Sequence, residues 1–175
     1  MITSELPLVE QILSDWQLAL AQDYRAYRNH VYRVIHFTRL FTPVDETQDQ
    51  QLQIAACFHD LGIWSDATFD YLGPSARRAS DYLIQHQLSH WLAPVSAMIE
   101  DHHKITASPH PLANAFRKAD WLEVTHGCLS FGLPRQRITE IQQAFPNAGF
   151  HRLLVHLSLK QLLTRPWSPL PMMRW

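Results

Sequence analysis

Apolar residues recur along this chain at intervals of three and four positions, the spacing of one helix face, and they seldom alternate as in a strand. The first such stripe predicts a helix over about residues 5–21, and it consists of Leu6, Val9, Ile12, Leu13, Trp16 and Leu20. The second predicts a helix over about residues 24–41, with an apolar side formed by Tyr27, Val31, Val34, Phe37 and Phe41. A third helix is expected over about residues 46–61, with Asp45 or Thr47 as its cap and Gly62 as its end.

The same pattern continues through the second half of the chain. Gly73, Pro74 and Ser75 open a fourth helix, and further helices are expected over about residues 91–103 and 111–126, from Pro134, and over about 149–163. The prolines of the last stretch, RPWSPLPMMRW, do not continue a helix, so this stretch should run extended over the surface. We therefore expect an all-α, single-domain helical bundle over residues 1–165, followed by an extended proline-rich tail at 166–175.

Composition limits the partners. The chain has 175 residues, 46% of them hydrophobic and 18% charged, and its formal net charge is −1, so no basic surface suggests a nucleic-acid polymer. The amino-terminal sequence has no signal-peptide pattern, and no segment approaches the roughly 18 apolar residues of a membrane span. We expect a cytoplasmic protein that has no membrane partner. The apolar stretch PLPMMRW could cover its own core or a neighbouring chain in a homo-oligomer.

The stretch AACFHDLGIW places His59 and Asp60 together at the end of an apolar run. Burying an unpaired carboxylate or imidazole is costly, so the pair needs a partner. A divalent cation beyond the helix end would satisfy both side chains. A buried histidine–carboxylate pair within an ordinary core is the alternative.

Two further residues of the same chemical types lie on other predicted helices. His30 sits beside the apolar side of its helix in YRNHVYRV, and Asp120 lies in the apolar context of NAFRKADWLEV. Together with His59 and Asp60 they supply two imidazoles and two carboxylates from three helices. That mixture suits a divalent transition metal with open positions for water and substrate.

In the order H…HD…D, and in the FHDLG and KAD contexts, these four residues resemble the signature of the HD-domain superfamily of metal-dependent phosphohydrolases. The resemblance covers about residues 24–126. It implies a helical bundle in which His30, His59, Asp60 and Asp120 bind one divalent ion, often manganese, iron, cobalt or nickel. It also implies cleavage of phosphoester bonds in nucleotides or related small molecules.

The chain departs from that family at several positions. Some nucleotide hydrolases of the superfamily have an acidic residue three positions after the HD aspartate, and here that position is Ile63. Asp66 is the nearest acid and therefore a candidate for proton transfer, with a helix-capping role as its alternative. Branches with two metals add histidines downstream, but the GPSARRA stretch has none where the first is usual, so we expect a single metal.

A second polar cluster, MIEDHHK, supplies candidates for substrate chemistry. His102 and His103 point about 100° apart on a helix, so we expect only one to face the interior, and we favour His103 as catalytic and His102 as a substrate-binding candidate. Exposed positions at a helix end are the alternative for both. Lys104 could meet a phosphate or complement the helix dipole, and Arg117, one turn before Asp120, could bind a substrate phosphate oxygen.

These observations predict that water activated by the metal attacks phosphorus, with Asp60 as both metal ligand and acceptor for the attacking water. Three alternatives stay open. The chain could be a di-iron oxygenase of the HD type, a noncatalytic HD module that binds a nucleotide, or a protein in which the HD residues are purely structural. Two irons per chain would indicate the oxygenase, and tight nucleotide binding without turnover would indicate the noncatalytic module. Absence of any bound metal would indicate a purely structural role.

Overall fold

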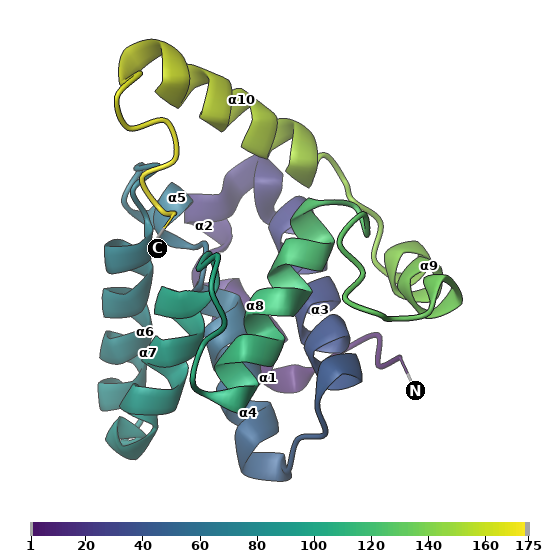
Figure 1. Ribbon diagram of the computed structural model, residues 1–175. Coiled ribbons are helices and arrows are strands. Elements are labelled where there is room, and N and C mark those ends of the chain that lie inside the picture. Colours follow the sequence, from purple (N-terminus) through teal and green to yellow (C-terminus); the bar gives the residue numbers. More distant parts are fainter. Residues whose placement is uncertain (1, 174–175) are drawn as a thin grey trace.

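Helices and the turns between them account for residues 2–173, which are the residues that the computed structural model describes (Figure 1). The all-α prediction is confirmed, and this part of the chain contains no strand. The elements are α1 (Pro7–Asp15), α2 (Gln17–Leu20), η1 (Ala21–Asp23), α3 (Tyr24–Phe41), α4 (Glu46–Phe58), α5 (Gly62–Ser65), α6 (Leu72–Gln85), η2 (Ser89–Trp91), α7 (Leu92–Asp101), α8 (Pro111–Val124), α9 (Arg135–Ala144) and α10 (Phe150–Thr164), where η marks a 3₁₀ turn. Within the same residues, no helix combines the length and the apolar character that crossing a bilayer requires.

Helix α3 is the centre of the bundle. It packs lengthwise against α8 and also contacts α4 and α9, and its side chains are buried over most of its length. Helix α7 lies between α4, α6 and α8, while α1 covers α4 from the other side. Helix α10 lies across one end of the bundle and contacts α3 (Figure 1). The polar residues singled out on α3, α4 and α8 therefore lie on neighbouring helices.

The predicted first helix is broken, which corrects the expectation of one helix over residues 5–21. Trp16, between α1 and α2, has φ −103° and ψ 7°, outside the helical region. Its ring packs edge-on against Phe58, with the ring centroids 6.4 Å apart. The break changes the direction of the chain, so that Leu13 before it and Leu20 after it both reach the core.

Gly62 opens a helix, whereas the sequence predicted that it would end one. Helix α4, capped by Asp45 as expected, stops at Phe58, and Gly62 is the first residue of α5. The backbone N–H of Gly62 donates to Ser75 Oγ at 3.0 Å, and a Cβ at residue 62 would lie 2.7 Å from the carbonyl oxygen of Tyr71. The missing side chain thus lets the start of α6 pack directly on the turn that holds His59 and Asp60.

The proline-rich tail does not run extended, in contrast to the prediction. It folds through two turns, in which the N–H of Ser168 bonds to the Arg165 carbonyl and the N–H of Met173 bonds to the Leu170 carbonyl. Met172 is buried against Ile63, Tyr71 and Leu72, so the tail covers part of its own core, returning from α10 towards α5 (Figure 1). Residues 174 and 175 of the predicted tail lie outside the described residues.

We predict that Gly62→Ala destabilises the fold by about 1–3 kcal/mol, because the new methyl group displaces the Tyr71 carbonyl or the turn beside it. Urea unfolding followed by circular dichroism measures the change. Gly73→Ala is the matched control, since its Cβ would meet only the flexible end of Arg77, and in a helix this exchange is neutral or stabilising by up to about 1 kcal/mol. Equal stability of the Gly62→Ala variant and the parent would show that the close approach has no energetic weight.

Candidate metal centre

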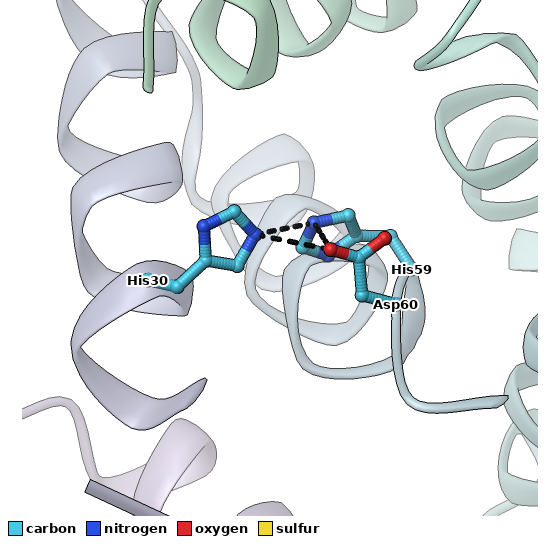
Figure 2. A group of neighbouring side chains, drawn as sticks. All are labelled: His30, His59 and Asp60. Atoms are coloured by element: carbon cyan, nitrogen blue, oxygen red, sulfur yellow. Dashed lines mark hydrogen bonds and ion pairs between the residues drawn. The ribbon is translucent and has the colours of Figure 1, made fainter. Parts of the chain in front are cut away.

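Four side chains from three segments meet inside the bundle. His30 comes from the middle of α3, His59 and Asp60 from the turn after α4, and Asp120 from α8. His30, His59 and Asp120 have no exposed surface, and Asp60 is 2% exposed. Figure 2 shows His30 pointing from its helix towards His59 and Asp60. The structure therefore brings together all four residues that the sequence proposed as metal ligands.

The distances within this cluster suit a shared ion. His30 Nε2 lies 2.9 Å from His59 Nε2, 3.4 Å from Asp60 Oδ2 and 3.7 Å from Asp120 Oδ1. His59 Nε2 lies 3.5 Å from Asp60 Oδ2 and 3.7 Å from Asp120 Oδ1. Two ligand atoms that are each about 2.1 Å from one ion lie about 3.0–3.5 Å apart, depending on the coordination geometry. The distances among His30, His59 and Asp60 fall within about 0.1 Å of that range, and the two distances to Asp120 Oδ1, both 3.7 Å, are slightly longer.

The protonation of the two imidazoles favours a cation between them. His59 Nδ1 lies 2.8 Å from the Ala56 carbonyl, which only accepts, so this nitrogen carries a proton. His30 Nδ1 lies 2.9 Å from the Glu123 carboxylate and carries a proton for the same reason. If both rings are neutral, the two Nε2 atoms present lone pairs to each other, so a positive charge must lie between them, either a proton on His30 or a bound cation that replaces it. The fixed tautomers thus present the ligand atoms to the cluster.

The carboxylates leave unsatisfied oxygen atoms in the same place. Asp60 Oδ1 and both oxygens of Asp120 are buried without a hydrogen-bond partner among the described residues. Burial opposes ionisation of Asp60, yet the charge of His59 and contacts with His102 and His30 hold its pKa well below the usual value. Burial likewise favours neutral His30, but the neighbouring carboxylates of Glu123 and Asp60 raise its pKa to about 9. The cluster therefore combines negative charge with free lone pairs, and the residues present fit a divalent ion.

His102 and His103 both reach the cluster, which corrects the expectation that only one would face the interior. His102 Nε2 lies 3.4 Å from Asp60 Oδ1, and His103 Nδ1 lies 3.7 Å from Asp120 Oδ2. Helix α7 ends at Asp101, and the cluster lies beyond that end, so neighbouring side chains converge on it instead of diverging around the axis. The sequence predicted that His102 binds substrate, but in the structure its Nε2 lies among the atoms that could bind a metal.

Asp60 thereby belongs to two overlapping groups of ligand atoms. One group contains His30 and His59, and the other contains His102 and His103; within each, the ligand atoms lie within 4.8 Å of one another. His102 Nδ1 contacts the Ile99 carbonyl at 2.6 Å, so its Nε2 also offers a lone pair. This second group was not expected from the sequence, because the GPSARRA stretch contains no histidine.

Tyr71 is a site residue that sequence reasoning missed. Its hydroxyl lies 2.6 Å from His103 Nε2, and burial, followed by the nearby charge of Asp60, raises the pKa of this phenol well above its usual value. The phenol therefore keeps its proton and donates it in this hydrogen bond. Tyr71 precedes α6 in a loop, a position that no helical periodicity reveals.

Behind His30, Glu123 and Arg33 form a buried ion pair. Arg33 Nε donates to Glu123 Oε1 at 2.8 Å, and Arg33 Nη1 donates to the Phe145 carbonyl at 2.8 Å. Burial opposes ionisation of Glu123, but His30 and Arg33 lower its pKa to about 2. Sequence reasoning missed both residues, although Arg33 follows His30 and Glu123 follows Asp120 by three positions, which places each pair on one helix face.

The remaining candidates have local partners instead. Asp66 is exposed and bonds to Ser65 and Arg78, which corrects its proposed role in proton transfer. The Arg117 guanidinium, proposed for substrate phosphate, donates to Asn114 Oδ1 and to the Lys104 carbonyl. The Lys104 ammonium lies 3.5 Å from Asp101. In the described part of the chain, neither Lys104 nor Arg117 pairs with Asp60 or Asp120, because other partners engage them.

Comparison of this chain with models of known families, with curated proteins and with solved structures gives no match. A functional proposal therefore depends on the side chains described above.

We predict that Glu123→Gln weakens binding of a divalent metal about 10–100-fold, because the carboxylate that orients His30 and increases its basicity is lost. Metal titration by calorimetry, at a temperature where circular dichroism shows the variant to be folded, measures the effect. Glu140→Gln is the control, since Glu140 lies on the outer side of α9, paired only with surface side chains. A Glu123→Gln variant with the affinity of the parent would contradict an orienting role.

Proposed function

We propose that this chain is a metal-dependent phosphohydrolase that cleaves a small phosphoester, such as a nucleotide, with one divalent ion held by His30, His59, Asp60 and Asp120. The observation that carries the proposal is the convergence of two imidazoles and two carboxylates, from separate helices, at ligand spacing in a buried position. The order of these residues, which resembles the HD-domain superfamily, supports the same function. Manganese, iron, cobalt and nickel all suit such a mixed set.

A divalent ion bound there would supply Lewis acidity towards a phosphoryl oxygen and would acidify a water molecule. The chain's own residues supply orientation and proton acceptors. Asp60 Oδ2 faces the two histidines His30 and His59, while its Oδ1 has no hydrogen-bond partner among residues 2–173 and can accept a hydrogen bond from a water, which orients that water. Glu123 and the Ala56 carbonyl hold the two imidazoles in the tautomer that leaves Nε2 free.

His103 connects the buried cluster to solvent. Its side chain is 13% exposed, whereas those of Asp60 and Asp120 are 3% and 1% exposed. Burial and the charge of His102 lower the pKa of His103 to about 3, so the ring is neutral near pH 7 and polar without adding positive charge. Together with the Tyr71 hydroxyl, it provides the polar contacts on the side from which a substrate phosphate approaches.

A second candidate is an oxidative enzyme with two iron ions, as in some HD proteins. The overlapping group of Asp60, His102 and His103 favours it, because one carboxylate with both oxygens directed to different imidazoles suits a bridging position between two ions. Hydrolysis by a single ion remains our principal proposal, because the first group has two imidazoles and one carboxylate within 4.8 Å of one another, and Asp120 Oδ1 lies 3.7 Å from both imidazole Nε2 atoms.

We predict that Asp60→Asn and Asp120→Asn each reduce metal binding strongly and bring phosphoester turnover to the background rate, since a neutral amide is a poor ligand for these ions. Turnover is measured with a panel of phosphoesters, and metal content by mass spectrometry of the purified variants. Asp66→Asn, on the exposed surface, should keep activity within about twofold of the parent. Full activity in Asp60→Asn would eliminate the proposed hydrolase.

Metal stoichiometry separates the two candidates. With one ion per chain, His102→Ala lowers the bound metal by less than half, since the four principal ligands are retained. With two ions per chain, the same variant loses one of them, and the parent consumes oxygen in the presence of substrate. Two irons per chain together with oxygen consumption would replace the hydrolase by the oxidative enzyme.

A further inference from the structure

Helix α10 presents an apolar face that no other part of residues 2–173 covers. Its first residue, Phe150, is fully buried, and Leu154 and Leu157 pack inward. Its opposite face carries exposed apolar side chains at intervals of three and four residues, namely Val155, Leu159, Leu162 and Leu163, the last of which is 83% exposed. Figure 1 shows α10 lying across one end of the bundle, and the exposure of these four side chains places them on the side away from the other helices. Contiguous exposed leucines of this kind mark an interaction surface.

Basic side chains border the same stripe. Arg152, His156 and Lys160 follow one another at intervals of four residues, so they form a row along one edge of the apolar face, and all three are exposed. All 16 acidic residues of the chain precede Ile141, so the segment that contains α10 carries positive charge without any carboxylate. The surface is therefore both apolar and cationic.

The turns after α10 extend this surface. Trp167 is 85% exposed, Leu170 is 47% exposed, and Arg165 lies between α10 and these residues. Tryptophan is favoured where an apolar layer meets water, because its ring is largely apolar and its N–H is polar. Leucine and basic residues on one exposed helix face, with an exposed tryptophan in the turn that follows, resemble the composition of helices that lie in the plane of a membrane interface.

We propose that the outer face of α10, with Trp167, docks on the surface of an anionic lipid bilayer. A second copy of the chain is a poorer occupant, because pairing of two α10 helices would bring Arg152 and Lys160 of both copies together, and α10 itself has no acidic side chain to compensate them. Anionic headgroups supply the missing negative charge, and the acyl chains take up the leucines. The sequence predicted no membrane partner because it has no segment long and apolar enough to cross a bilayer. A helix that lies in the plane of the interface does not need such a segment.

Co-sedimentation with vesicles tests this docking. The parent protein should bind vesicles that contain phosphatidylserine more tightly than vesicles of pure phosphatidylcholine, and added salt should weaken the binding. Replacing Leu159 and Leu163 together by serine should weaken it at least about tenfold, because two exposed leucines lose their contact with the acyl layer. Arg152→Ala and Lys160→Ala should each weaken it about fivefold. Leu18→Ser, at a 97% exposed leucine on α2, is the matched control and should leave binding unchanged.

These variants change exposed positions, so circular dichroism should show parental folding and phosphoester turnover in solution should be unchanged. Equal binding of the parent to neutral and anionic vesicles would overturn the proposal, and so would variants that bind as the parent does. A parent dimer, detected by light scattering and dissociated by the Leu159 and Leu163 replacements, would also overturn it and assign the face to a second copy.

Discussion

The interior of this bundle depends on compensation of buried negative charge. Asp60, Asp120 and Glu123 lie within a core made of aromatic and aliphatic side chains, and each is held ionised against the cost of burial. Arg33 balances part of this charge, and the histidines balance another part only when protonated. The arrangement of α3, α4, α7 and α8 is therefore tied to the presence of positive charge between them, and the divalent cation that we propose would have a structural as well as a chemical role.

The fold class and the four residues that meet in the buried cluster followed from the sequence because both depend on local information. Helical periodicity identified α3, α4 and α8 closely, and an acid or imidazole inside an apolar stripe already signals a buried partner. The contacts that the sequence did not predict arise from tertiary packing. Tyr71 reaches His103 from a loop, and the convergence of His102 and His103 arises because the cluster lies beyond the end of α7. Spacing along one helix carries no information about such an approach.

The corrected assignments have a common physical cause. Asp66 and Arg117 were placed near the cluster by sequence proximity to Asp60 and Asp120. In the folded chain, Asp66 finds Ser65 and Arg78, and the Arg117 guanidinium finds Asn114 and a backbone carbonyl. Ser65 and Asn114 are near neighbours of these two groups in the sequence, so contact with them costs little additional conformational entropy, and Arg78 and the Lys104 carbonyl come from other segments that pack nearby. Proximity in sequence to a ligand is therefore weak support for a role in the same site.

Phe150 links the surface of the molecule to its centre. Gly149, with φ +98°, turns the chain sharply into α10, and the Phe150 ring then stacks on His30 with centroids 4.0 Å apart and planes 17° apart. This ring shields one side of the imidazole from bulk water. Any displacement of α10 would hydrate His30 and raise the local dielectric, which weakens every charge interaction around it. The position of α10 consequently affects the strength of the charge interactions between His30 and the carboxylates around it.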